Sequence, residues 1–168
     1  MQLTKKITML LLAVFMTAAA SAQDKKPASP AATATGKING ANITINYSSP
    51  YVKGRTIWGD LVPYGKVWRA GANAPTTLET DKAIKIEGKD LPAGKYAVYV
   101  IPQERYATVI IGKDPTIGFN KYTEGNDQIR VDVKTQKSAR MNESLVYTIA
   151  NDKIVLSWEN LDIPLNVK

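Results

Sequence analysis

GKYAVYVIPQERYATVII, at positions 94–111, contains the two apolar runs that decide the fold class of this chain. Every residue from Tyr96 to Ile101 is apolar or aromatic, which predicts a strand that is buried on both faces. The run from Tyr106 to Ile111 is mostly apolar and predicts a second strand. Both runs are shorter than a typical helix, so they indicate a domain whose centre is made of strands.

The rest of the chain repeats apolar residues with a period of two, which is typical of half-buried strands. The alternating positions are Ile43, Ile45 and Tyr47; Ile84 and Ile86; Ile129, Val131 and Val133; Leu145, Tyr147 and Ile149; Ile154, Leu156 and Trp158; and Ile163, Leu165 and Val167. Turn residues such as Asn39-Gly40 and Asn151-Asp152 separate these runs. We predict an all-β fold over residues 37–168, a single antiparallel β-sandwich of jelly-roll-like type with at most one short helix.

The first residues have the layout of a cleavable export signal. Lys5 and Lys6 precede an uncharged apolar run at 7–20, and Ala20-Ser21-Ala22 fits a cleavage site. The run is short for a membrane span, which disfavours a retained signal anchor, and the chain has no cysteine that could carry a bacterial lipid anchor. We expect a signal peptide at 1–22, no integral membrane segment after its removal, and a periplasmic or extracellular protein.

The residues that follow the expected cleavage site, QDKKPASPAATATG at 23–36, are rich in Ala, Pro, Ser and Thr. This composition offers little apolar surface to offset the entropy of ordering the chain, so we predict a flexible leader.

Two residue types are missing from the whole sequence, since it contains no histidine and no cysteine. Their absence excludes Ser-His-Asp and Cys-His catalysis and removes the usual ligands of zinc, copper, haem and iron–sulfur clusters. We therefore expect no metal and no cofactor. The net charge of +7 is spread among acidic residues rather than gathered in a stripe, so nucleic acid is not an expected partner. The sequence gives no indication of oligomeric state.

The segment at 48–77, SSPYVKGRTIWGDLVPYGKVWRAGANAPTT, lacks the alternation found on either side of it. It holds two of the three tryptophans, and glycines and prolines divide it into turns. Aromatic rings beside convergent polar groups are typical of small-molecule sites, so we expect a small molecule or a glycan to bind here. The candidate ligand-binding residues are Tyr51, Arg55, Trp58, Tyr64, Trp68, Arg69 and Asn73.

Two blocks of this chain resemble an exported bacterial family known as domain of unknown function 2911. The string R-x-I-W-G-x-L-V-P-Y-G-x-V-W-R-x-G-A-N at 55–73 is similar to the family's signature, and G-x-x-L-P-A-G-x-Y-x-x-x-x-I-P at 88–102 is similar to its second block. The resemblance implies a secreted, β-rich domain without an assigned activity, and it supplies no catalytic residues. The chain departs from the pattern at Ala74-Pro75, where members often have an acid, and at Ala107, where they often have tryptophan.

Two other functions stay open. The aromatic segment can serve only to brace the fold of a structural or protein-interaction module. A hydrolase is the third alternative, but the spacing places no two acids together and assigns no catalytic residue. The residues considered for it are Asp60, Glu79 and Asp81, with Tyr51, Tyr64 and the group Ser48, Ser49 and Lys53.

A long segment at 112–127 has little strand pattern. Its aromatic residues Phe119 and Tyr122 are expected either to form a lid over the aromatic segment or to pin the loop to the sandwich.

Overall fold

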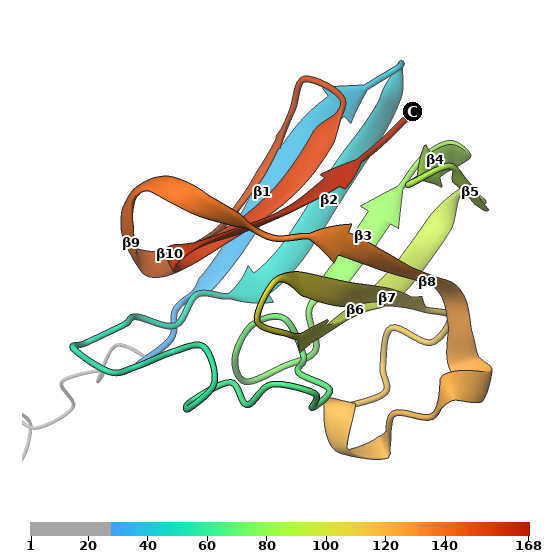
Figure 1. The fold of residues 1–168 in the computed structure, drawn as a ribbon. Helices are drawn as coiled ribbons and strands as arrows, with labels where there is room; N and C mark the ends of the chain where they lie inside the picture. Colours follow the sequence, from blue (N-terminus) through green and yellow to red (C-terminus); the bar gives the residue numbers. More distant parts are fainter. Residues whose placement is uncertain (1–27) are drawn as a thin grey trace, which may run out of the picture.

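The computed structural model describes residues 28–168 of the chain (Figure 1). The expected signal peptide at 1–22 lies outside the described residues, and so does the part of the expected leader at 23–27. Among the described residues, no helix has both the length and the apolar character that crossing a membrane requires.

The described residues form ten strands and two single-turn 3-10 helices. The bounds are β1 Ala31–Ile38, β2 Ala41–Ser48, β3 Thr77–Thr80, β4 Ile84–Ile86, β5 Lys89–Leu91, β6 Gly94–Pro102, β7 Tyr106–Gly112, η1 Phe119–Lys121, η2 Glu124–Asn126, β8 Asp127–Lys134, β9 Gln136–Ala150 and β10 Lys153–Asn166. Every pair of neighbouring strands is antiparallel, which confirms the predicted all-β fold. The prediction allowed one short helix; the described chain has two 3-10 turns, both in the long loop, and no α-helix.

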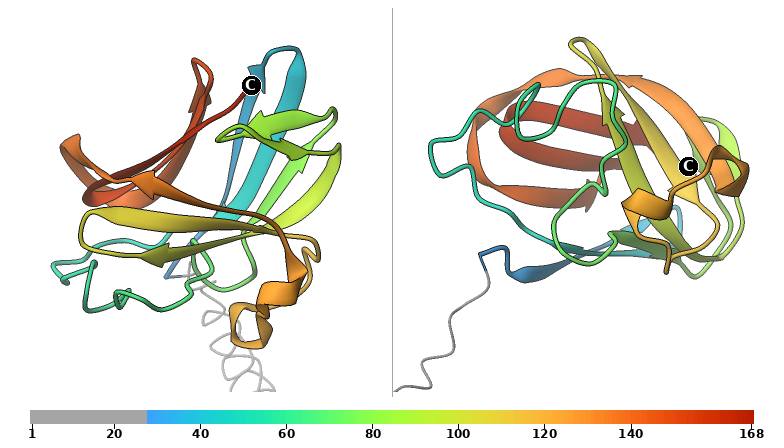
Figure 2. Two further views of the ribbon diagram at one scale, coloured as in Figure 1. Left: turned by 45° about the vertical axis from the view of Figure 1, so that its right-hand side comes forward. Right: turned by 90° about the horizontal axis from the view of Figure 1, so that it is seen from below.

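The two layers of the fold are unequal. One is a six-stranded sheet in the order β1-β2-β3-β6-β7-β8, and the other is the long β9–β10 hairpin. Because β9 contacts β1 while β10 contacts β8, the hairpin reaches from one edge of the sheet to the other (Figure 2). Between the layers lies the main core, which includes Ile43 and Ile45 of β2, Val100 of β6 and Leu156 of β10. A small third element, the β4–β5 hairpin, is bridged to the end of the chain through Ile86 and Val167.

Residues 31–36 belong to β1, so the prediction that they form part of a flexible leader was wrong. They pair with β2 along the whole strand, and the small side chains of Ala32 and Ala34 pack against the core. Gly36 allows β1 to approach β9 closely, because a Cβ at this position would lie 2.6 Å from the carbonyl oxygen of Ile149. The small residues of β1 can therefore form a strand, because close contact with the backbone of β9 takes the place of large apolar side chains.

Strand β6 is buried on both faces, as its sequence predicts. On the face turned away from the main core, Ala97 and Tyr99 form a second apolar cluster with Ile110 of β7. Val67 from the aromatic segment and Tyr122 from the long loop pack against this cluster. The sheet thus holds the aromatic segment and the long loop in place through this second cluster.

Tyr122 pins the long loop to the sheet. Its ring lies against that of Tyr99, with centroids 5.1 Å apart, and its hydroxyl donates to the Asp127 carboxylate at 2.8 Å. Arg130 in turn donates to the Tyr122 oxygen at 2.9 Å. Burial, followed by the hydrogen bond to Asp127, raises the pKa of Tyr122 to about 12. The side chain of Phe119 lies outside what the structure describes.

Candidate functional site

The aromatic segment predicted at 48–77 joins β2 to β3 through residues 49–76, and it begins by pairing with β9. The amide of Val52 donates to the Glu143 carbonyl at 2.7 Å, and the amide of Leu145 donates to the Pro50 carbonyl at 2.9 Å. These bonds satisfy backbone groups that would otherwise be left open beside the hairpin. The start of the segment is therefore fixed to the second layer of the fold.

The middle of the segment pairs with the other layer, at the end of β6. Trp68 and Val100 exchange two backbone hydrogen bonds, of 2.8 and 2.9 Å. The amide of Gly65 donates to the Pro102 carbonyl at 2.9 Å. Strand β3 pairs with β6 only as far as Ala97, so the aromatic segment continues as the neighbour of β6 where β3 is too short. Trp68 is consequently held by regular backbone pairing although it lies in a loop.

A glycine turn separates Trp58 from Tyr64. Gly59 has a φ of 88°, which side chains rarely tolerate, and a Cβ here would lie 2.8 Å from the Tyr64 ring. Tyr64 therefore packs over the turn and remains 40 % exposed. Its ring supports the loop from outside.

All three tryptophans of the chain meet in one cluster. Trp68 stacks against Trp158, with centroids 5.8 Å and planes 19° apart, and Trp58 meets both rings edge-on. The Trp68 Nε1 donates to the Gly71 carbonyl at 3.0 Å, and the Trp58 Nε1 donates to the Trp158 carbonyl at 3.3 Å. The Trp158 Nε1 is shielded from solvent and has no acceptor among the described residues.

A β-bulge positions Trp158. The pairing of β9 with β10 shifts register between Ser157 and Glu159, and Glu159 has a φ of 54°. Bulges occur often beside functional sites, where they redirect a side chain. In the aromatic segment, the buried Ala70 and the cavity-lining Asn73 also have left-handed φ values, of 53° and 55°. Non-glycine residues in this conformation are held there by their surroundings.

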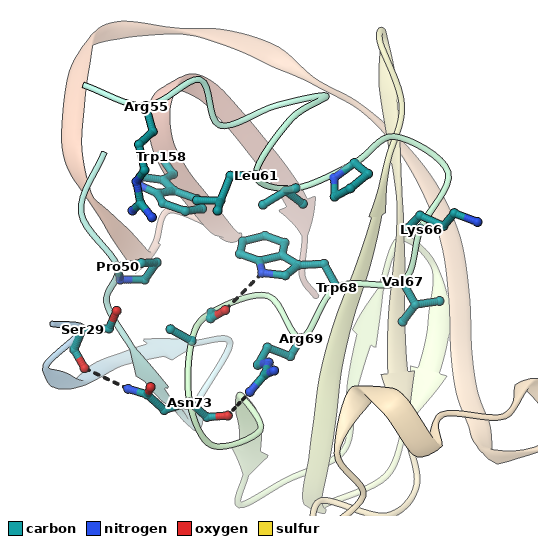
Figure 3. A pocket seen from close by; sticks show the side chains of 14 residues that line it. Ser29, Pro50, Arg55, Leu61, Lys66, Val67, Trp68, Arg69, Asn73 and Trp158 are labelled. Carbon is teal, nitrogen blue, oxygen red and sulfur yellow. Dashed lines mark hydrogen bonds between the residues drawn. The ribbon is translucent and has the colours of Figure 1, made fainter. Parts of the chain in front are cut away.

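Beside the tryptophan cluster lies a cavity of about 520 Å³, which we call the tryptophan cavity (Figure 3). This volume is within the range of about 300–1,000 Å³ that is usual for small-molecule sites. The residues that line it are Ser29, Pro50, Arg55, Leu61, Val62, Pro63, Lys66, Val67, Trp68, Arg69, Gly71, Ala72, Asn73 and Trp158.

Two arginines at the cavity are anchored by backbone carbonyls. Arg55 donates from Nε to the Val52 carbonyl at 3.0 Å and from a terminal nitrogen to the Tyr51 carbonyl. Arg69 donates to the Asn73 carbonyl, and the Asn73 side chain donates to the Ser29 carbonyl at 3.1 Å. Figure 3 shows Arg55 beside Trp158 and Arg69 on the Asn73 side of the cavity. The carbonyls orient the guanidinium groups without removing their charge.

The charge on the described lining is of one sign. Arg55, Lys66 and Arg69 contribute cationic groups, and none of the described lining residues is acidic. In Figure 3 the Lys66 ammonium points away from the tryptophans, whereas both arginines lie against the cavity wall. The cavity thus combines an apolar wall with hydrogen-bond donors.

The structure brings together four of the seven predicted site residues, because Arg55, Trp68, Arg69 and Asn73 line the cavity. Trp58 packs behind Trp68 and does not line it. Tyr51 and Tyr64 are exposed outside the lining. The substituted family positions Ala74, Pro75 and Ala107 are also outside it.

Trp158 is the main lining residue that the sequence reasoning missed as part of the site. It was predicted only as one of the alternating apolar positions of a strand, far along the chain from Trp68. Its identity as the third tryptophan was the available indication, but no spacing links it to the aromatic segment. Ser29 was missed because it lies in the segment predicted as a leader.

The residues considered for hydrolysis do not meet. Among the described residues, the exposed side chain of Glu79 pairs with Lys95 at 3.8 Å, and Asp81 accepts hydrogen bonds from Asn42. These hydrogen bonds hold the pKa of Asp81 below its ordinary value. Asp60 lies on an exposed turn.

Ser49, one of the two serines considered for catalysis, makes a structural hydrogen bond to the backbone instead. The Ser49 hydroxyl is buried and donates to the Leu145 carbonyl at 2.7 Å, so it is engaged in joining the aromatic segment to β9. The ammonium of Lys53 lies 5.9 Å from the centroid of the Tyr51 ring. The described residues also contain no group of three or more carboxylates that could hold a metal ion.

The family model described as "Protein of unknown function (DUF2911)" matches residues 29–167. The chain belongs to the DUF2911 family. The match begins at Ser29, so the DUF2911 domain includes β1 and every residue that lines the tryptophan cavity. No curated protein and no solved structure shows significant similarity to the chain.

Proposed function

We propose that this DUF2911 domain is exported and binds a small molecule or a glycan, without catalysis, in the tryptophan cavity. The observation that carries the proposal is the placement of Arg55, Arg69 and Asn73 around a cavity walled by Trp68 and Trp158. Sites for small molecules combine an apolar wall with a few oriented polar groups, and this cavity has both. The export signal expected at 1–22 supports a location outside the cytoplasm.

A binding role is favoured over hydrolysis because the described lining holds no carboxylate. Hydrolysis of a glycosidic bond uses a pair of acids on either side of the bond. The acids considered from the sequence are engaged elsewhere or lie on exposed turns.

The structural role is a second candidate, and one observation favours it. Trp158 is only 1 % exposed and the aromatic segment pairs with both layers, so the same residues brace the fold. Bracing alone does not require a cavity with oriented cations. The two roles are compatible, because the same residues can stabilise the fold and line a binding site.

The experiment is a ligand screen of the purified domain, read by thermal unfolding and by tryptophan fluorescence. A ligand of the folded state raises the melting temperature. Two of the three tryptophans line the cavity and Trp58 packs against both of them, so tryptophan emission reports on its occupation. We expect a glycan or small molecule to change both signals. The change should be lost in Arg69→Ala and kept in Arg140→Ala, an exposed arginine outside the lining. A screen without any such ligand, or equal responses from both variants, would rule out this site.

Export is tested separately, by expressing the full chain in a bacterium and sequencing the N-terminus of the protein found outside the cytoplasm. We expect the mature chain to begin at Gln23. Retention in the cytoplasm with Met1 in place would contradict the proposal.

A further inference from the structure

The charge of the tryptophan cavity narrows the class of ligand, an inference that rests on the proposed function. Three of the described lining residues are cationic and none is acidic. An anionic ligand would be attracted electrostatically to this lining, whereas a neutral ligand would gain no such attraction.

Arg55 is the group best placed to meet an anion. It donates hydrogen bonds to the carbonyls of Tyr51 and Val52, and no carboxylate among the described residues lies within ion-pair distance of it. Two anchors fix the plane of the guanidinium while N–H groups on its terminal nitrogens remain for a ligand. A planar, oriented guanidinium is suited to two parallel hydrogen bonds with a carboxylate.

Arg69 and Asn73 add further polar groups to the cavity lining, and both side chains contain N–H donors. Arg69 lies on the Asn73 side of the cavity, and the Trp158 indole N–H, which is shielded from solvent, has no acceptor among the described residues. Such unsatisfied buried donors are rare in folded proteins. A wall of this kind favours a ligand rich in acceptor oxygens.

The apolar part of the wall favours a ring. Trp68, Pro50 and Leu61 line the cavity, and Leu61 is 44 % exposed at its edge. Tyr51, whose carbonyl anchors Arg55, is exposed nearby and adds an aromatic surface outside the cavity. Aromatic side chains that continue from a cavity onto the surface suit a chain of sugar rings better than a single compact ion.

We infer that the tryptophan cavity binds an acidic glycan through a uronic-acid unit, whose carboxylate pairs with Arg55 while its ring packs against Trp68. The pairing is electrostatic and reversible, so no covalent step is involved. Because Arg55 is exposed, added salt should weaken the binding.

The test is a fluorescence titration of the mature domain with four matched probes. They are a glucuronic-acid tetrasaccharide, the neutral glucose tetrasaccharide with the same linkages, benzoate and sodium sulfate. We expect the acidic glycan to bind at least about tenfold more tightly than the neutral one, which is the discrimination typical of one charge-assisted hydrogen bond. Benzoate and sulfate, which lack the sugar ring or any ring, should bind more weakly than the acidic glycan.

Two variants assign the preference to its residue. Arg55→Gln should reduce the preference for the acidic glycan to near one, while Arg140→Gln, the matched control, should leave it unchanged. Circular dichroism of both variants shows whether they are folded, and Arg55→Lys, which keeps the charge but not the fork of donors, should restore part of the preference.

The outcomes separate this inference from the function on which it rests. Equal binding of both tetrasaccharides would overturn the acidic class and leave a glycan-binding cavity in place. Binding of benzoate or sulfate as tight as that of the acidic glycan would overturn the uronic-acid unit. Failure of these probes while the broad screen finds another ligand would overturn the inference alone, and failure of both would overturn the proposed function as well.

Discussion

Trp68 and Trp158 stack with their ring centroids 5.8 Å apart, although one lies in an irregular segment and the other in a long strand. Trp68 is attached to the six-stranded sheet through Val100, and Trp158 belongs to the β9–β10 hairpin. The stack therefore joins the two layers at the end of the molecule where the cavity opens. The same two rings line the cavity that is proposed to bind a ligand.

Replacing each ring with alanine should separate these two roles. Trp158→Ala is expected to lower the free energy of unfolding by about 3–5 kcal/mol, the usual cost of removing a large buried aromatic ring. Trp68→Ala should cost less, because Trp68 is only half-buried, yet it should abolish binding. Denaturant unfolding followed by circular dichroism measures the cost. Tyr106→Ala, at a ring 43 % exposed and away from the cluster, serves as the control and should cost under about 1 kcal/mol. Equal losses of unfolding free energy in the two tryptophan variants would contradict this prediction, which rests on the greater burial of Trp158.

Gly36→Ala should destabilise the domain, because the added Cβ would lie 2.6 Å from the Ile149 carbonyl and force β1 away from β9. Overpacking of this kind costs about 1–3 kcal/mol. Gly125→Ala is the matched control, since nothing lies within 4 Å of its Cβ position. The melting temperatures of both variants give the comparison. A Gly36 variant as stable as the control would show that the close contact between β1 and β9 does not contribute to stability.

Tyr147 predicts how stability depends on alkaline pH. Its hydroxyl donates to the Ala70 carbonyl at 2.8 Å, and burial raises its pKa well above the ordinary value of 10.0. A pKa that is higher in the folded state contributes stability below pH 10, and this stability is lost as the pH rises toward the folded value. Tyr147→Phe should cost about 1–2 kcal/mol at neutral pH from the lost hydrogen bond. Its unfolding free energy should then fall less steeply above pH 10 than that of the wild type. Parallel curves across this range would disprove the assignment.

Tyr122→Ala should loosen the loop at 113–126 without affecting the cavity. The ring contact with Tyr99 and the hydrogen bonds to Asp127 and Arg130 would all be lost. We expect faster amide hydrogen exchange in the loop, with ligand affinity unchanged. Tyr122→Phe keeps the ring contact and should give an intermediate rate. A loss of affinity in the alanine variant would instead indicate that the loop acts as a lid.

The strands could be predicted because their pattern is local. Ile43, Ile45 and Tyr47 alternate with polar residues, and all three are buried in β2. The same reasoning failed at 31–36, where Ala and Thr provide no large apolar side chain to mark a strand. There the decisive contact is between Gly36 and Ile149, which are distant in the sequence.

The site was predicted in part for the same reason. Arg55, Trp68, Arg69 and Asn73 belong to one segment with an unusual composition, so the sequence marks them together. Tyr64 belongs to the same segment, but its ring packs over Gly59 rather than into the cavity. Trp158 arrives through the pairing of β9 and β10, which a pattern of period two does not place relative to the aromatic segment.

The position of Ser29 has a practical consequence for handling the protein. Ser29 lines the cavity and accepts a hydrogen bond from Asn73, while the C-terminus lies at the opposite end of the fold (Figure 1). An affinity tag fused just ahead of Ser29 would start at the mouth of the cavity and compete with whatever enters it. Purification and surface immobilisation through Lys168 would leave that mouth open.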